Sequence, residues 1–202
     1  MTFDLALRAT EVLLALAFIQ QSAEHVFGGG PARRLFAWRL LLALALLSGV
    51  QSAWSILLLS FHSLAVLNRF QGTYIGGSDR MGLLILYCIC LAHWLPVALL
   101  PEVAFCYLAV QMMLSYFMSG KVKIVNPDWR SGRALSDVLA FSAYPVSERL
   151  HGLAVRSRLM FVASWAVILF ELAFPLALLN QALLIVALGV AGFFHLANAC
   201  LF

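Results

Sequence analysis

The chain has 202 residues, of which 63% are hydrophobic and only 11% are charged, with a net charge of +4 and a mean hydropathy of +0.96. Soluble globular proteins are about half apolar and about a quarter charged, and a soluble domain of this length cannot bury so much apolar surface. The composition therefore predicts an integral membrane protein and excludes a soluble enzyme, a disordered chain and a secreted disulfide scaffold. Anionic lipid headgroups and the positive-inside bias account for the positive charge, so we expect no nucleic-acid partner.

The apolar runs predict a series of helices in chain order. Residues 5–26 form an amphipathic first helix, which we expect to be retained and not cleaved as a signal peptide. Residues 35–67 are too long for one crossing and are interrupted at 48–52, which predicts two antiparallel helices. A polar loop covers 68–80. Four further segments are near the length of a membrane span: 81–100, 103–118, 159–179 and 182–202.

The positions of the cations favour seven crossings. If the break at 48–52 is a turn, the loops after the first, third and fifth helices share one side of the membrane. Those loops then hold twelve of the thirteen Lys and Arg residues, Arg39 among them, and the opposite side keeps only Arg8. The positive-inside rule places that side, with the C-terminus, in the cytoplasm. We therefore expect a multi-pass protein of a cell inner membrane.

The connection 119–158 is the only long loop, and it contains a predicted short helix. Asn126 and Pro127 are typical of an N-cap followed by a first helical residue. An apolar stripe follows, made of Ala134, Leu135, Val138 and Leu139. The pattern predicts a single helix that lies on the membrane surface and is anchored by Trp129.

Polar groups at membrane depth are candidate functional residues because their burial in lipid is costly. Glu171 and His93 lie at similar depth in their segments and could face each other, while His195 and Asn198 share a helix face. The alternative for each histidine is a hydrogen bond to a neighbouring helix. Two histidines at matching depth could also ligate a b-type haem. The cysteines lie in apolar runs without a CxxC pattern, and we predict no metal site.

Two lysines, Lys121 and Lys123, follow the fifth predicted helix and precede Asp128 and Trp129. A lysine that is partly withdrawn from water at such a boundary can act as a base. The alternative is that both cations only complement the helix dipole and the lipid phosphates.

Residues 70–81 contain Gly76-Gly77-Ser78-Asp79-Arg80-Met81, and residues 115–135 contain the pattern G-x-x-K…D-W-x-x-G. The first stretch resembles a loop of the bacterial HTTM-domain proteins, whose membrane domain is shared with vitamin K-dependent gamma-carboxylase. The second stretch is similar to a signature of the same family, and the terminal His-Leu-Ala-Asn at 195–198 also fits. The resemblance covers the chain from about Arg69 to its end.

The resemblance implies a role for Lys123, which lies three residues after Gly120, as the lysine of vitamin K chemistry does in the carboxylase. The chain has one more residue than the animal enzymes between this lysine and Asp-Trp, and no counterpart of the family's earlier loop histidine. The large lumenal domain is absent from this sequence, so we do not expect peptide carboxylation. The carboxylase works on the lumenal side, whereas the charge count places Lys123 inside, and the side stays open.

Together these observations predict an all-α polytopic bundle of about seven transmembrane helices, with residues 1–202 forming one HTTM-like domain. The favoured function is binding of a quinone or other lipid-like ligand near the interface, with redox-coupled base chemistry at Lys123. Asp79, Arg80 and Asp128 would orient the ligand or Lys123, and Trp129 would form a wall. The alternatives are a non-catalytic accessory subunit of a larger membrane complex and a haem-bearing electron-transfer subunit. Whether the protein is an enzyme stays open, as does whether the natural chain continues past Phe202.

Overall fold

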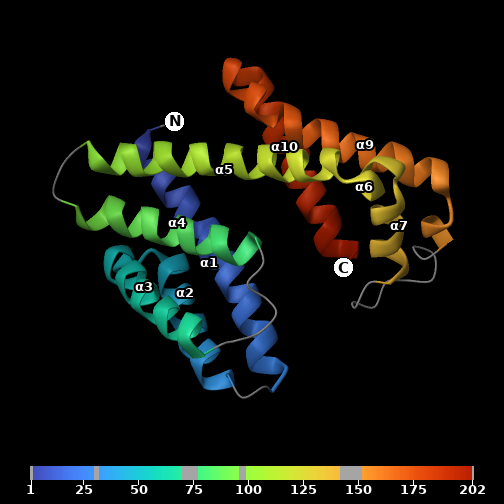
Figure 1. Cartoon of the computed structure of the whole chain (residues 1–202). Coiled ribbons are helices and arrows are strands. Elements are labelled where there is room, and N and C mark those ends of the chain that lie inside the picture. The colour runs from blue at the N-terminus through green and yellow to red at the C-terminus, as the bar shows by residue number, and fades with distance from the viewer. Residues whose placement is uncertain (1, 30–31, 70–76, 96–98, 142–151, 202) are drawn as a thin grey trace. The chain divides into compact units, whose positions relative to one another are not determined.

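The computed structural model describes the chain apart from residues 1, 30–31, 70–76, 96–98, 142–151 and 202, and the described chain is helical (Figure 1). No strand occurs among the described residues, which confirms the all-α prediction. The chain divides into two compact units, Met1–Val110 and Gln111–Phe202. The single domain expected from the sequence stays a prediction.

The first unit is built from four helices and the beginning of a fifth: α1 (Phe3–Phe27), α2 (Arg33–Ser48), α3 (Ser52–Arg69), α4 (Gly77–Trp94) and the start of α5 (Leu100–Val125). The predicted break at 48–52 is confirmed, because α2 ends there and α3 begins. Gly49 caps α2 with φ 76°, a left-handed conformation that glycine adopts without steric cost. Gln51 also has a positive φ of 53°.

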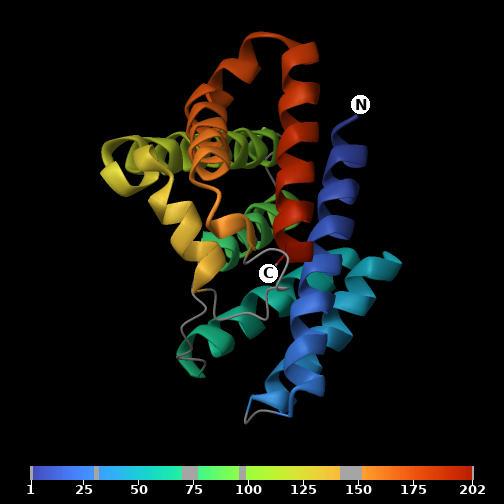
Figure 2. The same ribbon diagram turned by 90° about the vertical axis from the view of Figure 1, so that its right-hand side faces the viewer.

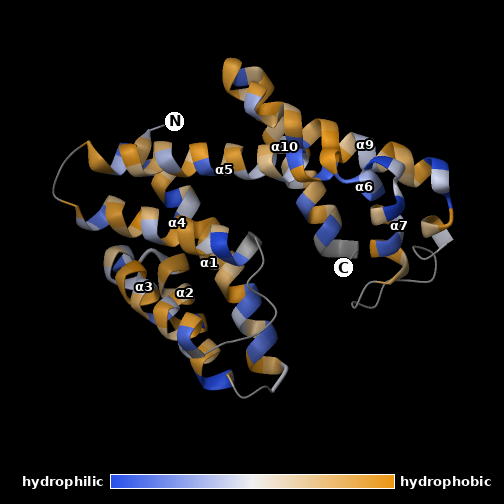
Figure 3. Ribbon diagram, in the orientation of Figure 1, coloured by the Kyte–Doolittle hydropathy of each residue, from blue (hydrophilic) through white to orange (hydrophobic). Residues whose placement is uncertain are grey.

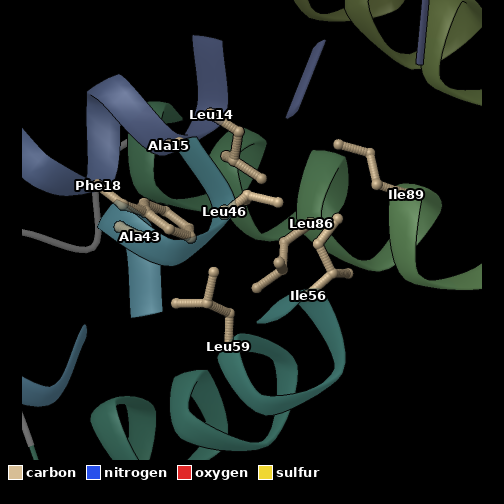
Figure 4. Packing of buried hydrophobic residues seen from close by; sticks show 9 residues of the cluster. All are labelled: Leu14, Ala15, Phe18, Ala43, Leu46, Ile56, Leu59, Leu86 and Ile89. Atoms are coloured by element: carbon tan, nitrogen blue, oxygen red, sulfur yellow. The ribbon is translucent and has the colours of Figure 1, made fainter. Parts of the chain in front are cut away.

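The core of the first unit is a cluster of aliphatic and aromatic side chains from α1 to α4 (Figure 4). Leu14 and Phe18 come from α1, Leu46 from α2, Ile56 from α3 and Leu86 from α4. Several of these side chains are fully buried, so packing of the apolar faces holds the four helices together.

The second unit contains the end of α5 followed by α6 (Pro127–Ser131), α7 (Arg133–Ala140), α9 (Ser157–Ala173), the 3-10 segment η1 (Phe174–Leu179) and α10 (Gln181–Leu201). Pro175 lies at the start of η1, where the regular α-helix ends. Figure 2 shows α10 running back from the turn at its beginning. Met113, Phe174 and Ala191 form a core between α5, η1 and α10.

Helix α5 is longer than its apolar pattern predicts. The expected segment 103–118 is extended at both ends, to Leu100–Val125. Pro101 fits in the first turn, where a missing amide donor costs nothing, and the next proline is Pro127. Lys123 therefore lies in the last turn of α5 rather than in a loop.

The predicted interfacial helix is two short helices. The Asn126 side chain caps α6 by accepting a hydrogen bond from the Asp128 amide at 2.9 Å, which confirms the predicted helix start. Gly132, with φ 82°, ends α6 and begins α7. The apolar stripe packs partly on protein, since Leu139 is buried against Met160 while Val138 is exposed.

Three helical segments of the described chain are long and apolar enough to span a membrane: Leu100–Val125, Ser157–Leu179 and Gln181–Asn198. Figure 3 shows apolar residues along α9 and α10 and polar residues around α6 and α7. The other predicted crossings are also helical but are not among these three, so the count of seven stays a prediction.

Candidate functional site

The ammonium group of Lys123 is at the centre of a cluster in the second unit. Its Nζ atom lies 2.6 Å from both carboxylate oxygens of Glu171 in α9. It also donates a hydrogen bond to Ser119 Oγ at 2.7 Å, and Ser119 in turn donates to Glu171 at 3.2 Å. The third neighbouring residue is Trp129, whose ring centroid is 5.1 Å from Nζ. The exposed fraction of the side chain is 16% for Lys123 and 7% for Glu171.

Two glycines allow the backbones around this cluster to approach closely. A Cβ atom on Gly120 would lie 2.9 Å from the Leu172 amide nitrogen and 3.0 Å from Glu171 Cβ. A Cβ atom on Gly132 would lie 2.6 Å from the Phe161 amide nitrogen. These distances are far below van der Waals contact. A larger residue at Gly120 would therefore force α5 away from α9, and one at Gly132 would force the α6–α7 junction away from α9. The glycines of the G-x-x-K…D-W-x-x-G stretch therefore serve the packing that brings Lys123 to Glu171.

Side chains of α9 fix α6 in place and with it the ring of Trp129. Ser164 is fully buried and donates to the Trp129 carbonyl at 2.5 Å. The indole of Trp165 donates to the Arg130 carbonyl at 3.0 Å. These bonds satisfy carbonyls at the end of a very short helix, which has few intrahelical partners.

A second polar pair lies on the same face of α5. Tyr116 and His195 of α10 share a hydrogen bond of 2.9 Å between Oη and Nε2. Tyr116 is three residues before Ser119, and its ring stacks on Phe174 and meets Phe170 edge-on. Because Phe170 precedes Glu171 directly, Tyr116 borders the Lys123 cluster. Asn198 lies one turn beyond His195 in α10 and is partly exposed.

Chemically, the cluster presents an ammonium, a carboxylate, a hydroxyl and an aromatic face within a small volume. Lys123 and Glu171 are close enough to exchange a proton directly. The cation–π contact with Trp129 is strengthened by the shielding of the ammonium from water.

Residues 91–202 of the chain match the HTTM domain family. That match covers more than half of the chain. The protein belongs to the HTTM domain family. Its family and its three apolar helices indicate a membrane protein. Neither a curated protein nor a solved structure is similar enough to the chain to count as a match.

The HTTM match includes every residue of the Lys123 cluster. The first unit contains a different ion cluster, most of which precedes the match. Glu11 of α1 is 2% exposed and accepts hydrogen bonds from Arg8 at 2.8 Å and from His93 of α4 at 2.5 Å. Arg8 also donates to the carbonyls of Leu46 and Leu47. It thereby caps the C-terminal end of α2.

This arrangement does not give the facing pair of His93 and Glu171 that their sequence depths allowed. His93 pairs with Glu11, and Glu171 pairs with Lys123. Depth along a segment leaves the rotation and the neighbours of a helix undetermined, so the partner of each group could not be chosen from sequence.

Arg39 is the centre of a further buried network in the first unit. The loop position expected for it is wrong, because Arg39 lies inside α2 and is only 7% exposed. Its guanidinium donates to Ser22 and Gln21, both at 2.8 Å, and packs over the ring of Phe36. Gln21 in turn donates to Asp79 at 2.9 Å, so an amide links the arginine to the carboxylate.

The other predicted site residues are placed as follows. Arg80 is exposed in the first turn of α4, and Asp128 is exposed in the first turn of α6. Asp79 and Arg80 belong to the first unit, whereas the partners of Lys123 all belong to the second. Residues 70–76 of the family-like loop lie outside the described residues.

No group of three or more His, Cys, Asp or Glu side chains that could hold a metal ion occurs in the described part of the chain. His62 and His195, the two histidines at matching depth in the sequence, are engaged through Nε2 with the Leu35 carbonyl and the Tyr116 hydroxyl. The structure offers no specific support for the haem alternative.

Sequence reasoning missed Glu11 and Ser119 as partners in these clusters. Glu11 interrupts an apolar run three residues after Arg8, and this i, i+3 spacing of opposite charges was the available signal. Ser119 lies four residues before Lys123, which places the two on one helix face, but a serine in an apolar helix is not distinctive enough to be singled out.

Proposed function

We propose that this HTTM protein binds a quinone or other lipid-like ligand at the membrane interface through the Lys123 cluster. The observation that carries the proposal is the ammonium of Lys123, held at the end of an apolar helix between Glu171 and the ring of Trp129. Ionisable groups are rare in such helices because their burial is costly, and they mark ligand or ion sites by default.

The surroundings of the cluster suit a ligand with a flat polar headgroup and an apolar tail. Lys123 and Ser119 offer hydrogen-bond donors, and Trp129 offers an aromatic face. Exposed apolar side chains of α5 and α9, such as Val122 and Phe161, provide a surface for a tail. Tryptophan is also the residue type enriched where lipid tails meet headgroups.

Base chemistry at Lys123 is the second part of the proposal, and it requires Glu171. An ammonium cannot accept a proton, so Lys123 must first pass one to the carboxylate at 2.6 Å. The neutral amine that results can accept a proton from a bound ligand, and the net charge of the pair does not change in the first step. A quinol hydroxyl is a proton donor of the appropriate kind.

Asp128 and Trp129 of α6, the helix that follows Lys123 in the chain, belong to the proposed site, with Asp128 exposed at the start of α6. Roles for Asp79 and Arg80 of the first unit, and for His93, stay predictions. The multi-pass location in a bacterial inner membrane and the relation to the carboxylase are parts of the same proposal.

The proposal is tested by purifying the full chain with its native lipids and comparing it with Lys123→Ala by mass spectrometry of the extracted lipids. We expect the wild-type chain to retain a quinone or related lipid and Lys123→Ala to lose most of it. Lys121→Ala is the matched control, because Lys121 is an exposed lysine two residues away in the same helix turn.

Retention of the same lipids by wild type and Lys123→Ala would refute the proposal. If instead the chain purifies only together with other membrane proteins and carries no such ligand, the accessory-subunit alternative is favoured.

A further inference from the structure

The pair formed by Lys123 and Glu171 carries no net charge. One ammonium faces one carboxylate, and both oxygens of the carboxylate are used. Both side chains are largely shielded, with 16% of Lys123 and 7% of Glu171 exposed. The site is therefore electrically balanced before any ligand enters.

The side chains that the structure brings to this pair from the neighbouring helices add no fixed charge, and the carboxylate of Asp128 in α6 is exposed to water. Helix α5 contributes Tyr116 and Ser119, and α6 contributes the ring of Trp129. Helix α10 contributes His195, which contacts Tyr116 and not the pair itself. Among these described neighbours only His195 can gain a positive charge, and its Nε2 atom is bonded to the Tyr116 hydroxyl.

A third charge entering a balanced and poorly hydrated site has no partner. An anionic headgroup that binds Lys123 must displace Glu171 and leave a carboxylate uncompensated, while a cation that binds Glu171 strands the ammonium. Either outcome costs far more than the same contact in water, since the interaction of charges grows as the local dielectric constant falls. An uncharged headgroup that exchanges only hydrogen bonds avoids this cost.

We infer that Glu171 determines the charge of the ligand that the site accepts. The inference rests on the proposed function and specifies its ligand class: uncharged polar headgroups bind directly, and a weak acid binds only together with its proton. In the second case the O–H bond of the acid breaks and its proton forms a new O–H bond on Glu171. Lys123 then exchanges one carboxylate for another, so the net charge of the site stays at zero.

The test uses two amphiphilic probes, uncharged decylubiquinone and oleic acid, bound to the full chain in detergent micelles over a pH series. We expect the wild type to bind oleic acid more weakly as the pH rises, because the proton that must accompany it becomes scarce. Glu171→Gln leaves Lys123 as an unbalanced cation, and we expect oleate to bind at neutral pH at least about tenfold more tightly than to wild type, with a weaker pH dependence. Glu102→Gln is the matched control, because Glu102 is an exposed glutamate of α5.

If Glu171→Gln does not fold, the double variant Lys123→Gln, Glu171→Gln replaces it, since removing both members of an ion pair leaves no buried charge. The double variant offers an anion no cation, so we expect it to bind decylubiquinone, and to bind oleic acid only with its proton and therefore more weakly as the pH rises.

Equal oleate affinities in wild type and Glu171→Gln, or oleate binding by the double variant that does not weaken as the pH rises, would overturn the inference. Its failure is distinct from failure of the proposed function. Binding of decylubiquinone to wild type without charge selection rejects the inference alone. If neither decylubiquinone nor oleic acid binds to the wild type or to Glu171→Gln, the inference and the proposed function are both rejected.

Discussion

The two units each contain a shielded carboxylate paired with a cation, but the two pairs are built differently. Glu11 in the first unit holds both Arg8 and His93, and Arg8 extends the cluster to the carbonyls at the end of α2. Glu171 of α9 in the second unit holds a single cation, Lys123 of α5, beside a hydroxyl and an aromatic ring.

The difference indicates different roles. The Glu11 cluster links α1, α2 and α4, and its polar groups form hydrogen bonds with other protein groups, which is typical of a cluster that stabilises the fold. Lys123 has a flexible stem, and its ammonium bonds to one carboxylate group and one hydroxyl, so a rotation of the stem can bring it to a ligand. We therefore expect substitutions in the first cluster to affect stability and those in the second to affect binding.

The largest expected effect is that of Gly132→Ala. Its φ of 82° is unfavourable for alanine, and the new Cβ atom would lie 2.6 Å from a backbone nitrogen of α9. We expect a loss of about 3 kcal/mol or more in the free energy of unfolding, together with loss of ligand binding. Unfolding in mixed detergent micelles measures it. Gly189→Ala in α10, where nothing lies within 4 Å of the new Cβ, should leave stability unchanged or raise it; equal losses in both would show that the clash at Gly132 is not the cause.

Glu11→Gln and Glu171→Gln test the comparison directly. Removing the Glu11 charge weakens its bonds to Arg8 and His93 and loosens the cap on α2, so we expect a loss of about 2–3 kcal/mol. Glu171→Gln leaves Lys123 its bonds to Ser119 and the ring of Trp129, and without a ligand in the site the ammonium can turn to water, so we expect about 1 kcal/mol. Urea or detergent unfolding of the two variants under the same conditions measures the two losses in the free energy of unfolding. A larger loss for Glu171→Gln would mean that the Lys123–Glu171 pair contributes more to stability than the Glu11 cluster.

Much of the fold was predictable because it depends on local signals. The break at 48–52, the start of α6 at Asn126 and the order of the helices follow from glycine, proline, capping residues and apolar runs. The end of α5 could not be predicted from the apolar pattern, because lysines are good helix formers and continue a helix beyond its apolar stretch. The split of the interfacial helix at Gly132 depends on close contact with α9, which local sequence does not record.

The site was predictable in its members and not in its pairing. Lys123, Trp129 and Glu171 were each identified as candidates, from a motif or from the cost of a charge in an apolar helix. Their mutual contact depends on the rotation of α9 against α5, which is set by packing at Gly120. Whether these residues bind a ligand stays a prediction.

Gly120→Ala separates the role of packing from that of charge in the second unit. The added Cβ atom would lie 2.9 Å from the Leu172 amide nitrogen and 3.0 Å from Glu171 Cβ, so α5 must move away from α9. We expect a loss of about 2 kcal/mol in the free energy of unfolding and weaker ligand retention with both charges still present. Thermal unfolding and lipid mass spectrometry measure the two effects. Gly82→Ala in α4, where the nearest atom is 3.7 Å from the new Cβ, is the control; full ligand retention by Gly120→Ala would show that the close approach is unnecessary.

The smallest expected effects come from two fully buried serines, one in each unit. Ser22 accepts a hydrogen bond from the Arg39 guanidinium, whereas Ser164 donates to the carbonyl of Trp129. A bond to a charged group is stronger than one between neutral groups, so Ser22→Ala should lower the free energy of unfolding by about 1.5 kcal/mol. For Ser164→Ala, an interhelical bond between neutral groups, we expect about 0.6 kcal/mol.

Thermal unfolding of both alanine variants, with the exposed Ser115→Ala as the neutral reference, measures this difference. Ligand retention should show the opposite order, because Ser164 positions the helix that carries Trp129, whereas Ser22 bonds to Arg39 within the first unit. If Ser22→Ala reduced ligand retention as much as Ser164→Ala, the division between a structural cluster in the first unit and a binding cluster in the second would be wrong.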